Sequence, residues 1–285
     1  MGHDLQQEIN FGAKLENTTI GFVGAGNMAN SLIRGLLSKG CSPASIIAAD
    51  VDQQKLQSLS SECGIRCADN QALADEADVI VLAVKTQIME TVCTQISLSA
   101  PTPLVVSIAA GITIEQLLNW LGSNTAIVRC MPNTPALVGK GASGLFANEY
   151  VSDGQKQLAQ SLMEAVGISV WVDGENDIDT VTAVSGSGPA YFFLFMEAMQ
   201  DAAKELGLSE ELAKQLVYQT ASGAADLAIQ SSDTTAELRR KVTSPGGTTE
   251  SAINTFETGE IRKLVKSALA DAKNRSIELS KETKS

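Results

Sequence analysis

The pattern of the chain changes once along its length, and this change constrains the fold more than any other feature. Up to about residue 172, short β-rich runs alternate with segments of helical pattern. Such alternation predicts βαβ units and a mostly parallel sheet. From about residue 177 only helical patterns follow. We therefore expect an α/β domain over residues 18–175, an all-helical domain over 176–285, and a disordered or tag-derived extension over 1–17.

The expected elements have definite bounds. The β-rich runs cover residues 18–23, 45–49, 79–84, 103–108, 126–130 and 168–172. The helical patterns of the second domain cover 177–206, 209–230, 234–242, 249–257 and 260–280. Thr234 and Glu237 have the spacing of a capping box at the start of one of these helices. Long runs of small residues, such as 221–225, permit close helix packing and suggest that the helical domain completes its core against another subunit. A compact monomer is the alternative.

The first β-rich run leads into a glycine-rich turn, residues 24–29 (GAGNMA), and then into a helical pattern. Gly24 and Gly26 match the first two glycines of the dinucleotide-binding fingerprint, and Ala29 takes the third position. Asp50 ends the second expected strand, where an acid binds the adenosine ribose hydroxyls and repels a 2′-phosphate. The motif predicts a Rossmann-type domain, and Asp50 favours NADH over NADPH unless it is only a solvated loop acid.

Further segments follow the later strands, at the edge where a dinucleotide would bind. Lys85 follows one strand, the small residues of 107–111 (SIAAG) follow the next, and Asn133 lies in 131–135 (MPNTP). Lys85 is equally well explained as a solvated loop lysine, and Asn133 as a turn former. The expected cofactor-binding residues are Gly24, Ala25, Gly26, Asn27, Met28, Asp50, Asn70, Ala83, Val84, Lys85, Ala109, Ala110 and Asn133.

A rigid, hydroxyl-rich turn over residues 242–249 (VTSPGGTT) precedes a helical pattern near the C-terminus. Pro245 restricts one φ angle, and the two glycines let a ligand approach the backbone closely. Thr248 or Thr249 is expected to cap the helix, whose first N–H groups favour a carboxylate or a phosphate. An ordinary helix entry is the alternative interpretation.

Residues 185–191 (SGSGPAY) interrupt another helical pattern with two glycines and a proline. These residues are unfavourable inside a helix, so the segment predicts a kink or a ligand contact. A purely structural crossing of two helices remains the alternative.

Charge and residue usage restrict the function. The 33 acidic and 21 basic residues give a net charge of −12, which disfavours binding to nucleic acids and to anionic membranes. No apolar run reaches membrane-spanning length and no signal sequence is apparent, so we expect a cytoplasmic protein.

The cysteines and the single histidine argue against metal and histidine chemistry. The five cysteines form no ligand set with His3, which is the only histidine, so we expect reduced packing residues and no metal site. A proton donor must then be a hydroxyl, a lysine, a carboxyl group, water or the substrate.

Six segments, GFVGAGNMA, AVK, SIAAG, MPNTPA, SGSGPAY and VTSPGGTTESA, resemble in order and spacing the pyrroline-5-carboxylate reductases, which catalyse the last step of proline synthesis. The resemblance extends from about residue 18 to the C-terminus. Thr86 stands where the family usually has proline, and Asp50 stands where it often has a small or hydroxyl residue. The second departure calls into question the usual tolerance of the family for NADPH.

The resemblance implies a small cyclic imine with one carboxylate as substrate and NADPH or NADH as hydride donor. It implies that Ser244, Gly246, Gly247 and Thr248 bind the carboxylate, and that Thr249 is the catalytic residue at the ring nitrogen. Glu175 and Ser187 are weaker candidates for the pocket. It also implies a homodimer, possibly a ring of dimers, in which a neighbouring subunit completes each site.

Three alternatives remain open. A reductase of a related cyclic imine acid would use the same carboxylate-binding turn. A β-hydroxyacid dehydrogenase would need a lysine after the domain junction, and residues 177–200 contain none. A non-catalytic dinucleotide-binding protein would have no need of the turn over 242–249.

Overall fold

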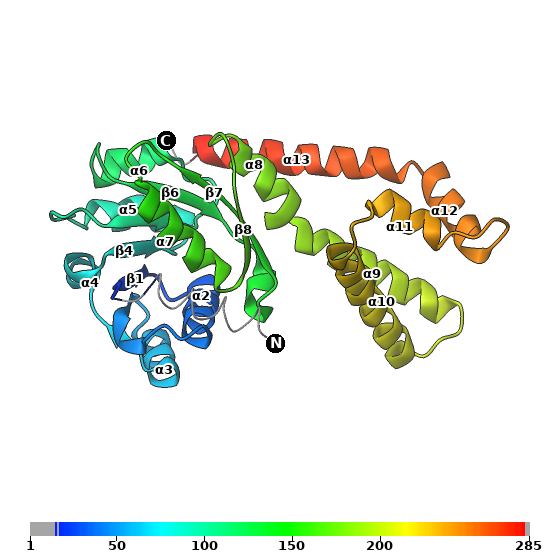
Figure 1. Ribbon diagram of the computed structural model, residues 1–285, viewed down its shortest axis with the longest axis horizontal. Helices are drawn as coiled ribbons and strands as arrows, with labels where there is room; N and C mark the ends of the chain where they lie inside the picture. The colour runs from blue at the N-terminus through cyan, green and yellow to red at the C-terminus, as the bar shows by residue number, and fades with distance from the viewer. Residues whose placement is uncertain (1–14, 16, 283–285) are drawn as a thin grey trace. The chain divides into compact units, whose positions relative to one another are not determined.

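The computed structural model describes residue 15 and residues 17–282 (Figure 1). The extension expected over residues 1–17, with His3, therefore lies almost wholly outside the described residues. The chain forms two compact units: Met1–Ser187 together with Ala272–Ser285, and Gly188–Asp271. This division comes later in the chain than the boundary expected at residue 175, and the C-terminal turns of the last helix belong to the first unit.

The first unit contains an eight-stranded sheet with the order β3-β2-β1-β4-β5-β6-β7-β8. All neighbouring strands are parallel except β6 and β7. The strands are β1 Ile20–Val23, β2 Ile46–Ala49, β3 Arg66–Cys67, β4 Val79–Leu82, β5 Leu104–Ser107, β6 Ile127–Met131, β7 Gly141–Ala147 and β8 Gly167–Trp171. The order reverses between β1 and β4, and open α/β sheets commonly bind ligands at the carboxyl ends of the strands at such a point.

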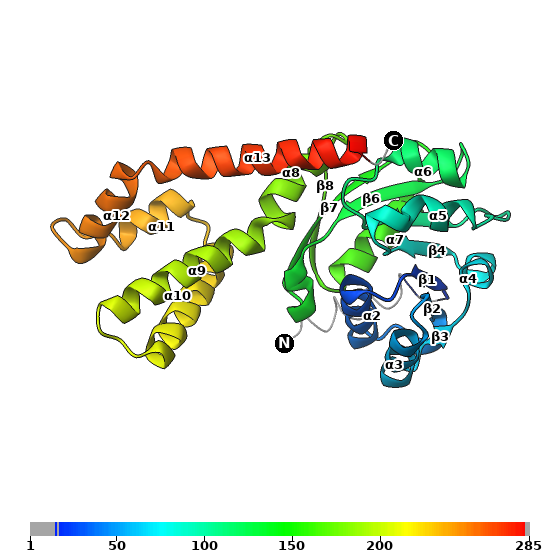
Figure 2. The ribbon, with the colours of Figure 1, turned by 180° about the vertical axis from the view of Figure 1, so that it is seen from behind.

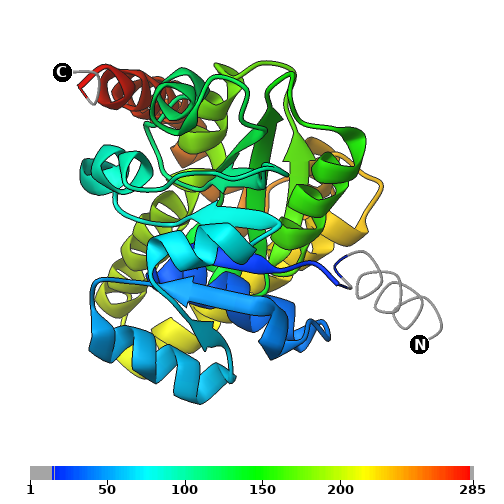
Figure 3. The same ribbon diagram turned by 90° about the vertical axis from the view of Figure 1, so that its left-hand side faces the viewer.

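Helices cover both faces of this sheet (Figure 3). One layer consists of α2 Asn27–Ser38, α3 Gln53–Cys63 and α7 Asp153–Glu164. The other consists of α4 Asn70–Glu76, α5 Met89–Thr94 and α6 Ile114–Leu121. Alternate residues of a strand enter the two cores: Phe22 of β1 lies in one and Val23 in the other. The central strands are apolar throughout because both faces are buried.

All six expected strands are present, and two strands were missed. β3 has only two residues, both exposed, so it carries no apolar pattern. β7 (GASGLFA) is rich in small residues, which are uncommon in strands. Its glycines are needed for packing, because a Cβ on Gly144 would lie 2.7 Å from the side chain of Val181. Tertiary packing, and not strand propensity, therefore determines β7.

The remaining elements are helical (Figure 2). Three short 3-10 helices lie in the first unit: η1 Pro43–Ser45, η2 Thr86–Ile88 and η3 Thr134–Val138. The elements after β8 are α8 Asp177–Val181, a π-helical turn η4 Thr182–Gly186, α9 Gly188–Glu205, α10 Glu210–Gln230, α11 Thr235–Lys241, α12 Thr248–Thr258 and α13 Ile261–Glu282. The break expected in the SGSG segment is this π-helical turn. The capping box of Thr234 and Glu237 is confirmed at the start of α11.

The second unit buries little apolar surface by itself. Within its described residues, the buried hydrophobic side chains are Ala213 and Val217. Phe192, Phe193 and Leu194, which follow one another in α9, are each more than 60% exposed. In the described part of the chain, no helix has both the length and the apolar character needed to cross a membrane.

Candidate functional site

The glycine-rich turn joins the carboxyl end of β1 to the start of α2. Gly24 has a φ of +101°, and a Cβ there would lie 2.8 Å from the carbonyl oxygen of Ala83, so the turn needs glycine at this position. A Cβ on Gly26 would meet only the same oxygen, at 3.9 Å. Packing therefore does not explain Gly26, whose expected contact with a pyrophosphate stays a prediction. Asn27 and Met28 begin α2, where N–H groups lack helical acceptors and favour an anion.

Asp50 lies directly beside this turn, at the carboxyl end of β2. Its Oδ2 accepts a hydrogen bond from the N–H of Ala25 at 2.7 Å, and its Oδ1 accepts one from the N–H of Asp52 at 2.9 Å. The side chain is only 14% exposed. The acid thus lies where the fingerprint requires it, and it also holds the glycine turn in place.

The other expected cofactor residues of the sheet edge follow β3, β4 and β5. Asn70 is the first residue of α4 after β3, residues 83–85 follow β4, and residues 109–110 follow β5. A short 3-10 turn, η2 Thr86–Ile88, continues the loop after β4. The Thr86 hydroxyl donates to the carbonyl oxygen of Ala110 at 2.9 Å and so ties two of these loops together. Parallel strands therefore bring these segments to one edge of the first unit.

Asn133 and Ser187 already have internal partners. Asn133 is 8% exposed; its Nδ2 donates to the carbonyl oxygen of Ser185 at 3.0 Å and its Oδ1 accepts from the N–H of Ala142 at 2.9 Å. The N–H of Ser187 donates to the carbonyl oxygen of Thr182 at 2.8 Å. These contacts give both residues structural roles, while their expected ligand contacts stay predictions.

Glu175 belongs to a buried ionic cluster that the sequence analysis missed. It accepts hydrogen bonds from the N–H of Ile114 at 2.8 Å and from Nη1 of Arg129 at 3.0 Å. Arg129 is 3% exposed, and its Nη2 lies 3.8 Å from Oδ1 of Asp179, which accepts from the hydroxyl of Ser276 at 2.7 Å. The sequence could have indicated this cluster, because an arginine inside the apolar run AIVRC needs an acidic partner when that strand is buried. Glu175 thus anchors β6 and α6, and its expected contact with substrate stays a prediction.

Residues 242–247 of the expected turn connect α11 to α12 in the second unit, and residues 248–249 begin α12. Gly246 has a φ of +71°, the left-handed conformation that favours glycine. The expectation that Thr248 or Thr249 caps the helix is wrong. Gly247 is extended and takes the cap position, with no side-chain hydrogen bond, so both threonines fall in the first turn of α12. Their side chains are exposed.

Glu250 changes the hydrogen bonding of this turn in a way that sequence analysis missed. Its Oε2 accepts from the N–H of Gly246 at 2.7 Å, and the N–H of Gly247 donates to the carbonyl oxygen of Ser244 at 3.0 Å. The N–H groups of Thr248 and Thr249 belong to the first turn of α12, where a helix supplies no acceptor. These two N–H groups can therefore donate to an anion, as can the hydroxyl groups of the turn.

Two of the cysteines, Cys93 and Cys130, have buried thiols that resist ionisation. Burial raises the pKa of the Cys93 and Cys130 thiols to about 12, and all five thiols are free. Cys67 is exposed, contrary to the expected packing role. No group of three or more histidine, cysteine or acidic side chains within the described residues could hold a metal ion.

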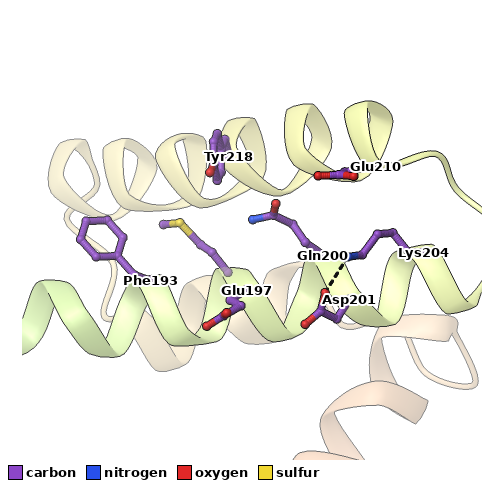
Figure 4. Close-up of a pocket in the computed structure, with 8 residues that line it drawn as sticks. Phe193, Glu197, Gln200, Asp201, Lys204, Glu210 and Tyr218 are labelled. Atoms are coloured by element: carbon purple, nitrogen blue, oxygen red, sulfur yellow. Dashed lines mark ion pairs between the residues drawn. The ribbon is translucent and has the colours of Figure 1, made fainter.

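The helical unit also contains two pockets outside these motifs. One of about 380 Å³ lies along α9 and α10 and has an acidic lining that includes Glu197, Asp201 and Glu210, with Asp201 paired to Lys204 at 2.8 Å (Figure 4). The other, of about 730 Å³, is formed by residues of α9 and α11–α13 and has a mainly apolar lining. Neither includes a residue expected to bind substrate or cofactor.

Known families match most of the chain. The family described as pyrroline-5-carboxylate reductase dimerisation matches residues 175–279. The family described as NADP oxidoreductase coenzyme F420-dependent matches residues 19–111. The pyrroline-5-carboxylate reductase of Pseudomonas aeruginosa is 51% identical over 265 residues, which are 92% of this chain and 97% of that protein. That of Vibrio alginolyticus is 43% identical over 94% of this chain and 99% of its own length.

Solved structures agree with these matches. A pyrroline-5-carboxylate reductase from Coxiella burnetii has a TM-score of 0.89 and 46% identity, covering 93% of this chain and 99% of its own. A Plasmodium falciparum pyrroline carboxylate reductase with NADP bound has a TM-score of 0.83 and 31% identity, with the same coverage. The chain therefore belongs to the pyrroline-5-carboxylate reductase family.

Proposed function

We propose that this chain reduces 1-pyrroline-5-carboxylate to L-proline, the last step of proline synthesis, with hydride from NADPH or NADH. The observation that carries the proposal is the exposed turn Ser244–Thr249 at the start of α12, in a chain of this family. The turn offers backbone donors and hydroxyl groups, which suit a substrate with one carboxylate and one ring nitrogen.

The substrate carboxylate is bound by the N–H groups of Thr248 and Thr249 and by the hydroxyl of Ser244. The positive end of the α12 dipole favours this charge. Gly246 and Gly247 set the backbone conformation of the turn and do not donate to the carboxylate. Their N–H groups are already bonded to Glu250 and Ser244. The net charge of −12 means that this local binding, and not overall attraction, must hold the anion.

Thr249 orients the ring nitrogen in the proposed reaction. An imine nitrogen is basic enough to arrive protonated, and its N–H donates to the Thr249 hydroxyl. Protonation makes the imine carbon electrophilic, and the bound dinucleotide supplies the hydride that reduces it to the amine. Catalysis then comes mainly from orientation, so no histidine is required.

The dinucleotide lies at the carboxyl edge of β1, β2 and β4. The open side of Gly26 and the first N–H groups of α2 receive its pyrophosphate, and Asp50 receives the adenosine ribose. Residues 83–85 and 109–110, after β4 and β5, would border the nicotinamide half, and Asn70, after β3, would border the adenosine half. Asn133 stays a cofactor candidate although its side chain has internal partners, and Glu175 and Ser187 remain the weaker candidates for the substrate pocket.

The proposed assembly is a homodimer formed through the helical unit. The match to a dimerisation family and the exposed apolar side chains of α9 support it. A ring of dimers and a cytoplasmic location stay predictions of the sequence.

The test is the oxidation of NADH and of NADPH, followed spectrophotometrically, with 1-pyrroline-5-carboxylate and with a six-membered cyclic imine acid. Faster turnover of the five-membered ring supports the proposal. Turnover of the six-membered ring alone would instead assign the chain to a related cyclic imine. No oxidation with either substrate would reject a cyclic-imine reductase.

A further inference from the structure

Lys55 lies beside Asp50, next to the end of β2. Its Nζ is 4.0 Å from Oδ2 of Asp50, and its side chain is 44% exposed, against 14% for Asp50. Its backbone N–H donates to the carboxylate of Asp52, which caps α3, so Lys55 is held in the first turn of that helix. A half-exposed ammonium thus accompanies the acid that the sequence predicts will exclude NADPH.

Asp50 is a much weaker barrier to a 2′-phosphate than an unpaired acid would be. Each of its oxygens accepts a backbone N–H, from Ala25 and from Asp52, and the ammonium of Lys55 lies nearby. Donors directed at a carboxylate offset its charge. A carboxylate has about four acceptor positions, so Asp50 can still accept a hydrogen bond from a ribose hydroxyl.

We propose that Lys55 binds the 2′-phosphate of NADPH, so that the chain uses both dinucleotides and Lys55 sets the preference between them. The proposal rests on the reductase function proposed above, because it requires a dinucleotide at the glycine turn. With NADH, the 2′-hydroxyl lies against Asp50 and Lys55 keeps its ion pair. With NADPH, the ammonium turns to the phosphate oxygens and offsets the repulsion from Asp50 and Asp52.

Lysine suits this role because its charge is compact and its four-carbon stem is flexible. Asp52 is the second acid beside the site, and its Oδ1 is already bonded to the N–H of Lys55. The Lys55 ammonium can therefore form either an ion pair with Asp50 or a contact with the phosphate.

The test measures binding without turnover, by calorimetry with two nucleotides that differ by one group. Adenosine 2′,5′-bisphosphate carries the 2′-phosphate and adenosine 5′-monophosphate lacks it. We expect Lys55→Gln to lower the affinity for the bisphosphate about tenfold, because a hydrogen bond to a charged group is lost. The affinity for the monophosphate should be nearly unchanged. The NADPH to NADH ratio of kcat/KM should fall by a similar factor.

Two further variants complete the design. Lys156→Gln removes an exposed lysine from α7, on a helix that follows β7, and should change neither affinity. Asp50→Ser should strengthen bisphosphate binding, and adding Lys55→Gln should cancel that gain.

If Lys55→Gln lowered the affinity for both nucleotides equally, or lowered neither, the role of Lys55 would be overturned. The proposed reductase function would be unaffected. Failure of the unmodified protein to bind either nucleotide would instead reject the proposed reductase function. Bisphosphate binding that is weaker than monophosphate binding in the unmodified protein would restore Asp50 as the excluding residue.

Discussion

At the scale of single residues, the proposed chemistry depends on hydroxyl and backbone N–H groups. The turn Ser244–Thr249 contains no ionisable side chain, and the nearest acid, Glu250, is bonded to the N–H of Gly246. Such groups act through position, because they neither gain nor lose charge during the reaction.

Replacing Thr249 with alanine should lower kcat by about tenfold or more while leaving the Kd for NADPH nearly unchanged, because the ring nitrogen loses its oriented partner. Steady-state kinetics and cofactor fluorescence measure the two quantities. Thr249→Ser keeps the hydroxyl and should retain most of kcat. Unchanged kinetics in Thr249→Ala would remove this residue from the mechanism.

The buried thiols of Cys93 and Cys130 should make stability depend on pH. Their folded pKa of about 12 lies above the ordinary value of 9.0, so above about pH 9 the unfolded chain loses protons that the folded chain keeps. The contribution of these thiols to the free energy of unfolding is therefore fully present below about pH 9. Above that pH the free energy of unfolding falls by about 1.4 kcal/mol per pH unit for each thiol.

Urea unfolding under reducing conditions at several pH values measures this slope. Cys130→Ala should make the slope shallower, whereas Cys67→Ala, at an exposed position, should not. A slope that is the same in all three proteins would contradict the assignment.

At the scale of elements, loops at the sheet edge are held by contacts far apart in sequence. The hydroxyl of Thr86 ties the loop after β4 to Ala110 in the loop after β5. A Cβ on Gly111 would lie 3.3 Å from Cβ of Leu279, so the end of α13 packs against this second loop. The two loops that border the proposed nicotinamide site are thus braced by η2 and by α13.

Replacing Thr86 with valine keeps the shape of the side chain and removes the donor. We expect the KM for NADH and for NADPH to rise about fivefold, because a hydrogen bond of about 1 kcal/mol that orders both loops is lost. The serine variant keeps the donor and should behave like the unmodified enzyme. Identical cofactor KM values in the valine and serine variants would show that the bond does not position the loops.

At the scale of the whole molecule, the chain leaves its first compact unit after Ser187 and returns to it at Ala272. Asp179 and Ser276, which lie near these two crossings, are joined by a buried hydrogen bond of 2.7 Å. Arg129 adds its charge to the same carboxylate. Within the first unit, this buried cluster therefore joins α8 to the C-terminal turns of α13.

The proposed homodimer should dissociate when a charged side chain is introduced into the mainly apolar pocket of the helical unit. Val265, half exposed in the pocket of about 730 Å³, offers such a position. Val265→Glu should produce a monomer and abolish activity, because covering a charge that stands in a mainly apolar lining is unfavourable. Light scattering and the reductase assay test this together.

Gln230→Glu adds a charge at an exposed position at the end of α10 and serves as the control. It should leave both the dimer and the activity intact. A fully active monomer of Val265→Glu would refute a site that depends on the partner subunit.

Local pattern alone predicted most elements of the fold. The strands were predictable because central parallel strands, such as β4 (VIVL), are apolar on both faces. The glycine turn and the capping box of α11 were predictable because their backbone conformations require particular residues. β7 was not predictable, because its small residues are selected by close contacts such as that of Gly144 with Val181.

The sequence by itself determined the order of elements, the position of the dinucleotide motif and the family. These properties follow from residues close together in the chain. Only the tertiary structure showed that Glu175 pairs with Arg129, that Glu250 bonds to Gly246, and that Lys55 lies near Asp50. Charged side chains have several possible partners in any sequence, and the partner they take depends on which elements the folded chain brings within a few ångströms.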